Sequence, residues 1–87
     1  MSAQVTNFKL RTDPGSRAIA RALTCCLARG LEVVELSWNA DGPEGRASLA
    51  LSGDADRLAR AGLWLERLVD VRVVAKGETT PLARGRF

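Results

Sequence analysis

The chain has 87 residues, enough for one small domain that buries only about 60% of its unfolded surface. Its 46% hydrophobic and 26% charged residues are typical of a folded globular protein, and no apolar run approaches the roughly 20 residues of a membrane helix. The net charge of +3 is too small to indicate nucleic-acid binding by itself, and histidine is absent. Because the sequence also lacks a CxxC motif and clustered carboxylates, we expect no catalytic residues and no metal ligands in this chain.

The first predicted elements are a strand and a helix joined by a turn. Alternate positions mark the buried face of the strand: Thr6, Phe8 and Leu10. A turn over residues 12–16 follows, and the helix is capped either by Asp13, with Pro14 in the first helical position, or by Ser16. Helical spacing predicts the buried stripe of this helix: Ile19, Ala22, Leu23 and Cys26. Gly30 ends the helix, at a position where a positive φ is expected.

Two strands and a second helix come next. Alternation in the second strand places three side chains toward the core: Val34, Leu36 and Trp38. Residues 39–45 are rich in turn-forming residues and predict a hairpin. The third strand is expected to bury three side chains in turn: Ala47, Leu49 and Leu51. Asp54 is a suitable cap for the second helix, which we expect to run to about Val69.

The fourth strand is predicted to begin at Asp70, because the helical spacing gives way there to alternation, with Val71 and Val73 toward the core. Beyond Gly77 the sequence shows no period, so residues 78–87 are expected to form a flexible tail. The order βαββαβ predicts an α+β fold, the ferredoxin-like sandwich. In this fold a four-stranded antiparallel sheet carries two helices on one face, and the second strand lies at an edge of the sheet.

The other sheet face stays open in this fold. The residues predicted to point there are mostly charged or polar: Lys9, Arg11, Glu35, Arg46, Ser48, Arg72 and Lys76. An RNA-recognition module would need aromatic residues on this face, so we expect no nucleic-acid partner. An acylphosphatase would need an Asn in the loop at residues 12–17, and a metal carrier would need two thiolates at the same turn. The sequence has neither.

Three stretches resemble the ACT domain family. Residues 10–15 (LRTDPG) are similar to the D-x-P-G turn of these domains, and residues 29–36 (RGLEVVEL) are similar to their helix end and second strand. Residues 65–71 (LERLVDV) resemble the L-x-K-L-V-D-V run of the small regulatory subunits of acetolactate (acetohydroxyacid) synthase, and the chain length resembles the short isozyme II type. We therefore expect an ACT-like domain over residues 1–77, followed by the tail.

The resemblance implies a non-catalytic subunit that supports the large catalytic subunit of acetolactate synthase in branched-chain amino-acid synthesis. Thiamine diphosphate, Mg²⁺ and FAD are expected on that large subunit, and no cofactor is expected on this chain. The resemblance also implies a homodimer joined through an edge strand and a branched-chain amino acid as effector. Sensing of valine is expected to be weak or absent, because Thr12 stands where valine-sensing members commonly have Asn.

Three sets of residues are candidates for contacts. The turn before the first helix is expected to hold the effector: Thr12, Asp13, Gly15, Ser16 and Arg17. The edge strand is expected to pair with a second copy: Val33, Val34, Glu35 and Leu36. The large subunit is expected to dock on a third set: Lys9, Arg11, Arg46, Trp64 and Arg72.

Each set has a plainer interpretation. The turn can serve only to start the helix, the basic residues can form a solvated sheet face, and Trp64 can be a partly buried rim residue. A second function also fits the resemblance, a stand-alone ACT-like amino-acid sensor that regulates another enzyme or transcription. The N-terminal residues 1–4 lack the basic and apolar parts of a signal peptide, and no membrane segment is predicted, so we expect a cytoplasmic protein.

Overall fold

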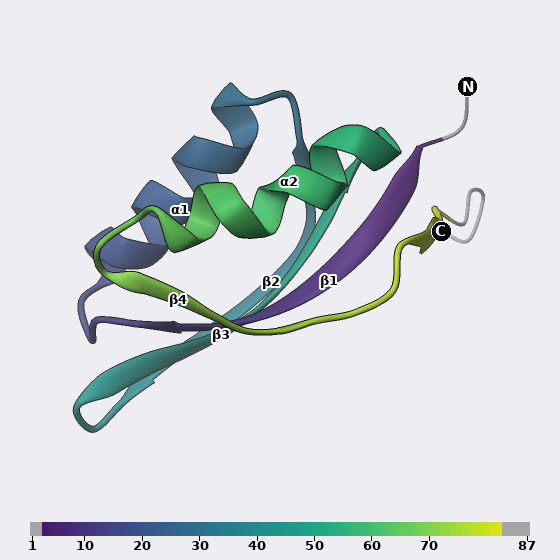
Figure 1. Cartoon of the computed structure of the whole chain (residues 1–87). Helices are drawn as coiled ribbons and strands as arrows, with labels where there is room; N and C mark the ends of the chain where they lie inside the picture. Colours follow the sequence, from purple (N-terminus) through teal and green to yellow (C-terminus); the bar gives the residue numbers. More distant parts are fainter. Residues whose placement is uncertain (1–2, 83–87) are drawn as a thin grey trace.

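Two helices cover one face of an antiparallel sheet in the computed structural model of the protein, which describes residues 3–82 (Figure 1). The elements in chain order are β1 (Gln4–Thr12), α1 (Ser16–Ala28), β2 (Glu32–Asp41), β3 (Glu44–Gly53), α2 (Ala55–Glu66), β4 (Val71–Lys76) and β5 (Thr80–Pro81). The strand order is β2-β3-β1-β4, with β5 also paired to β1. The predicted ferredoxin-like α+β fold is confirmed, with β5 as an additional strand.

β1 is the central strand and separates the core from the open face. It pairs antiparallel with β3 along one side and with β4 along the other. As predicted, the side chains of Thr6, Phe8 and Leu10 are buried, and Thr12, which was expected in the turn, is buried as well. The odd-numbered residues of this strand from Asn7 to Arg11 are exposed on the opposite face. The period of two read from the sequence therefore places the core side of the sheet correctly here.

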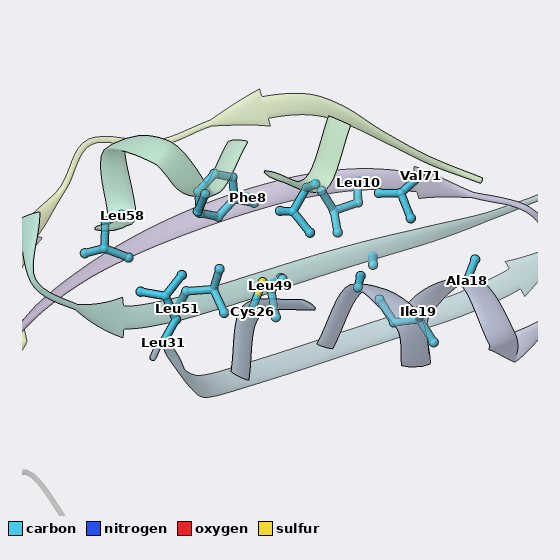
Figure 2. Close-up of a cluster of buried hydrophobic side chains, with 14 residues drawn as sticks. Phe8, Leu10, Ala18, Ile19, Cys26, Leu31, Leu49, Leu51, Leu58 and Val71 are labelled. Atoms are coloured by element: carbon cyan, nitrogen blue, oxygen red, sulfur yellow. The ribbon is translucent and has the colours of Figure 1, made fainter. Parts of the chain in front are cut away.

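The hydrophobic core lies between the sheet and the two helices, as Figure 2 shows. Seven of its larger side chains are at most 2% exposed: Phe8, Leu10, Leu31, Leu49, Leu51, Leu58 and Leu65. Each such side chain contributes about 1.5–3 kcal/mol of transfer free energy on burial. These residues come from β1, β3, α2 and the segment between α1 and β2, and α1 adds its own buried side chains: Ala18, Ile19, Ala22 and Cys26. The core therefore holds the two central strands and both helices together.

β2 departs from the predicted alternation near its start. Val33 lies opposite Leu51 and Leu36 lies opposite Leu49, with a register shift between them. Directly opposite residues of an antiparallel pair share a face, so Val33 and Leu36 point toward the helices. Val34, which the alternation places toward the core, is the extra residue of a β-bulge and is 44% exposed. A bulge reverses the sheet face to which each residue before it points. The alternation of apolar residues in the sequence does not reveal this reversal.

The predicted hairpin between the second and third strands is present, with Gly42 and Pro43 as its two-residue loop. Gly42 has a φ of +81°, which suits the first central position of a type II′ hairpin turn. Further along the chain, Gly30 has a φ of +85° at the end of α1, as expected. Both turns therefore depend on the conformational freedom of glycine.

The two helices begin in different ways. The carboxylate of Asp54 caps α2 and accepts a hydrogen bond from the backbone N–H of Arg57 at 2.9 Å, as predicted. The cap of α1 is Gly15, and no side chain bonds to the first N–H groups of this helix. Both predicted caps of α1, Asp13 and Ser16, are therefore wrong, since Ser16 is already the first helical residue and Asp13 lies outside the helix.

α2 ends at Glu66, three residues before the predicted Val69, and residues 67–70 form a turn that leads into β4. The N–H of Leu68 donates to the carbonyl oxygen of Leu65 at 3.1 Å, and the N–H of Val71 donates to that of Leu68 at 3.3 Å. Leu68 packs against the core although it lies outside the helix. The apolar spacing therefore continues past the point where the helical hydrogen bonds stop.

The residues after β4 run back along the start of β1. Gly77 donates its N–H to the carbonyl oxygen of Asn7 at 2.8 Å, and β5 places Thr80 opposite Val5. The N–H of Leu82 donates to the carbonyl oxygen of Ala3 at 3.1 Å. Part of the segment expected as a flexible tail thus pairs with β1, and residues 83–87 lie outside the described part. Within residues 3–82 no helix has the length and apolar character needed to cross a bilayer.

Candidate functional site

The five predicted effector residues lie at the turn between β1 and α1, where one of them is buried and four are exposed. Thr12 is 4% exposed. Its hydroxyl accepts a hydrogen bond from Trp38 Nε1 at 3.2 Å and donates to the carbonyl oxygen of Asp13 at 2.8 Å. Gly45 packs so closely here that a Cβ would overlap both the hydroxyl and the indole nitrogen. Thr12 therefore connects β1 with β2 and β3, and its hydroxyl also bonds to the first residue of the turn.

The four exposed residues of the predicted effector set border an open hollow at the start of α1: Asp13, Gly15, Ser16 and Arg17. Arg21 and Asp70 border it from the other side and form an ion pair. The first turn of α1 contains no acidic residue and no side-chain cap, so its N–H groups are open to an anion. Asp70 Oδ1 has no hydrogen-bond partner. The hollow thus offers donors for a carboxylate, whereas the Asp70 carboxylate is occupied by Arg21 through Oδ2 and buried at Oδ1.

Among residues 3–82, one titratable group is clearly perturbed, and it lies elsewhere, in the core. Burial raises the pKa of the Cys26 thiol from an ordinary 9.0 to about 11, and the neighbouring Cys25 adds to this rise. Cys26 is therefore a neutral thiol at pH 7 and packs as an apolar side chain. Among the described residues, no three His, Cys, Asp or Glu side chains come together as metal ligands would.

The two edges of the sheet differ in how accessible they are. β2 pairs with β3 on one side, and no strand within residues 3–82 lies on its other side. Val34 is 44% exposed and Leu36 is 38% exposed along this edge. At the opposite edge, the N–H of Val73 in β4 donates to Glu66 Oε1 at 3.3 Å. A side chain thus satisfies part of the β4 edge, whereas β2 presents its edge to solvent.

Of the predicted edge set, the bulge gives each residue a different environment. Val33 is half-buried on the core side, and Glu35 points to the open face opposite Ala50. The two exposed apolar residues, Val34 and Leu36, are the ones that a second strand would cover. The structure therefore places all four predicted residues on an edge strand. Only two of them, Val34 and Leu36, expose apolar surface there.

The open face carries three arginines side by side, which we call the arginine row: Arg46 in β3, Arg11 in β1 and Arg72 in β4. Arg11 lies directly opposite Arg46 on one side and directly opposite Arg72 on the other. Arg11 also forms an ion pair with Glu44 at 3.2 Å. Lys9 lies one step along the same face, and its Nζ donates to Ser48 Oγ at 3.3 Å.

The predicted docking residues do not form one surface. Lys9 and the arginine row share the open face, whereas Trp64 lies in α2, on the helical side of the sheet. Trp64 packs against the core, and the Arg29 guanidinium lies 4.6 Å from the centre of its ring. Lys76, also predicted on the open face, lies opposite Phe8, because the β1–β4 register shifts between Lys9 and Leu10. Lys76 is exposed, but it lies on the same face of the sheet as Phe8 and not on the open face.

Sequence reasoning missed Asp70 and Glu66 as functional candidates. Asp70 was read only as the start of a strand, although its backbone carbonyl oxygen also accepts a hydrogen bond from the N–H of Asp13 at 3.1 Å. The sequence position of Asp70 could have indicated its role. An acidic residue directly before β4 lies at the same end of the sheet as the turn after β1. Glu66 gives no such signal, since its contact with β4 depends on where α2 ends.

No protein-family model and no curated protein matches the sequence. Among solved structures, an uncharacterized protein from Thermotoga maritima is 14% identical, with 93% of this chain and 99% of that chain covered and a TM-score of 0.63. A homoserine dehydrogenase from Thiobacillus denitrificans is 12% identical over 93% of this chain and 18% of its own, with a TM-score of 0.66. The C-terminal domain of the MgtC protein from Mycobacterium tuberculosis is 12% identical over 95% of this chain and 92% of that domain, with a TM-score of 0.61.

These likenesses are similarities of fold. They define the chain as a small α+β domain of the ferredoxin-like kind, a scaffold that carries many unrelated functions. The function of this chain therefore has to be argued from its own edges, hollows and charges.

Proposed function

We propose that this chain is a non-catalytic regulatory subunit that pairs with a second copy through β2 and supports the large catalytic subunit of acetolactate synthase. The main evidence for pairing through β2 is the difference between the two sheet edges. β2 has no strand partner on its outer side within residues 3–82 and exposes Val34 and Leu36, whereas Glu66 occupies part of the β4 edge. An accessible strand edge with apolar side chains favours the addition of another strand.

A second copy is a suitable partner for this edge. Two β2 strands that meet around a twofold axis run antiparallel and present the same residues to each other, as an isologous interface requires. The two four-stranded sheets then continue into one. A domain of 87 residues has a small core, and burial of the exposed Val34 and Leu36 in such a pair adds apolar contact that the single chain lacks.

The identity of the large partner rests on the sequence resemblance around residues 65–71. In this proposal the large subunit carries thiamine diphosphate, Mg²⁺ and FAD, and both chains act in the cytoplasm. The buried and hydrogen-bonded Thr12 supports a weak or absent response to valine, because its hydroxyl is committed to Trp38 and Asp13.

The direct test is co-expression with an acetolactate synthase large subunit, followed by purification through a tag on the large subunit and an activity assay. We expect co-purification and a higher activity than that of the large subunit alone. The matched control is the large subunit expressed without this chain. Absence of both the complex and the rise in activity would contradict the proposal.

A second candidate function is a stand-alone amino-acid sensor, and the hollow at the start of α1 favours it. That hollow exposes uncapped backbone N–H groups, which suit the carboxylate of an amino acid. Calorimetric titration of the isolated chain with valine, leucine and isoleucine tests this function. Saturable heat without any partner present would favour the sensor over the subunit.

A further inference from the structure

The arginine row is an unusual arrangement for a sheet face. Like charges at directly opposite positions of neighbouring strands destabilise a sheet, yet Arg11 has an arginine opposite it on both sides. Within residues 3–82, the ion pairs involve only Arg11 of the three, through Glu44. Arg46 and Arg72 thus add repulsion with no compensating ion pair in the described residues.

A shallow hollow of about 330 Å³ lies on the open face beside the row. Its polar lining consists of basic side chains and neutral hydrogen-bonding groups: Lys9, Arg11, Arg46, Ser37, Asn39 and Ser48. No carboxylate lines it. Glu44 borders the next hollow toward β4, and Glu35 borders the next one along β2. The charged side chains that line this hollow are therefore all positive, and Glu44 lies outside the lining, paired with Arg11.

We propose that this hollow binds a small anion with two or more negative charges, of the phosphate or diphosphate type. The planar guanidinium groups of Arg11 and Arg46 match pairs of phosphate oxygens, and the Lys9 ammonium group adds a mobile positive charge. The hydroxyl of Ser48 and the amide of Asn39 supply neutral donors on the β3 and β2 sides. The bound anion offsets the repulsion between Arg11 and Arg46, the two arginines that line the hollow.

The lining favours a small anion over an extended polymer. Single-stranded nucleic acid is held by aromatic side chains on which its bases stack, and no aromatic residue lines the hollow. A long acidic peptide would need positive charge along the strands, but Glu35 and Ala50 lie two residues farther along the face from Ser37 and Ser48. The positive charge is thus concentrated at one end of the face. The proposal stands independently of the regulatory function.

The test is a titration of the isotope-labelled full chain with sodium diphosphate, followed by amide chemical shifts, with ionic strength held constant by sodium chloride. We expect saturable shifts centred on residues 9–11 and 46–48. Inorganic phosphate is expected to bind at the same residues more weakly, because it carries less charge. A single-stranded oligonucleotide is expected to bind less tightly than diphosphate.

Two variants decide whether the row is responsible. Arg46→Gln is expected to weaken diphosphate binding about tenfold, the loss typical of one charge-assisted hydrogen bond. Arg60→Gln removes the same charge from the exposed side of α2 and is expected to leave binding unchanged. The amide spectrum of each free variant shows whether its fold is intact.

Four outcomes would overturn the proposal. They are the absence of saturable shifts, equal weakening by both variants, shifts centred on the start of α1, and tighter binding of the oligonucleotide than of diphosphate. Because no partner subunit is present, these results are separate from those of the co-purification experiment.

Discussion

Replacing Arg46 by Gln is expected to raise the stability of the free domain. Arg46 lies directly opposite Arg11, is exposed, and is in none of the ion pairs within residues 3–82. Two guanidinium groups roughly 7 Å apart in water repel each other by about 0.6 kcal/mol, within the range of about 0.2–1 kcal/mol for cross-strand pairs. For a domain of this size, the gain corresponds to a rise in Tm of roughly 1–8 °C.

Thermal unfolding at low and high salt tests this reasoning. The gain is expected at about 10 mM salt and is expected to shrink at 1 M, because the screening length falls from about 30 Å to about 3 Å. Arg60→Gln, which changes the net charge equally, is the control, and its effect is expected to stay within about 0.5 kcal/mol. A loss of stability in Arg46→Gln, or a gain that does not depend on salt, would refute the attribution to repulsion within the row.

Three further predictions concern the edge, a helix cap and the buried thiol. Leu36→Lys is expected to dissociate the proposed dimer in light-scattering chromatography, whereas Leu63→Lys on the exposed side of α2 leaves it intact; dimers in both variants would contradict edge pairing. Asp54→Ala is expected to cost about 1 kcal/mol in urea unfolding, and an unchanged midpoint would argue against the cap. The raised pKa of Cys26 predicts that the free energy of unfolding is unaffected by this thiol below about pH 9 and falls by about 3 kcal/mol as the pH rises through about 11. Cys26→Ser, compared at both pH values, should lack this fall.

The sequence was informative for several features that local physics decides, although the cap of α1 was not one of them. The alternation of Thr6, Phe8 and Leu10 placed the core face of β1, because a regular central strand has a strict period of two. Asp54 and Gly30 marked a helix start and a helix end through a cap and a positive φ. These features depend on neighbours within a few residues, which a single sequence displays.

Features that depend on distant residues were missed. The bulge at Val34 reflects how β2 fits against β3, and the early end of α2 reflects where Leu68 reaches the core. The arginine row shows the same limit, because its members were each predicted on the open face while their register was not. Only the pairing of Arg11 with its neighbours on two strands reveals that three like charges stand in line.

The pairing of β5 with β1 brings the two ends of the described chain together. The hydrogen bond from Leu82 to Ala3 places both ends at one corner of the sheet, as Figure 1 shows. Arg11 lies seven residues along β1 from Gln4, roughly 23 Å away at the rise of a strand. A short linker between the two ends is therefore expected to permit circular permutation, with new termini opened at the exposed loop of Gly42 and Pro43. A fluorescent label at either end of residues 3–82 would likewise leave the hollow beside the arginine row unobstructed.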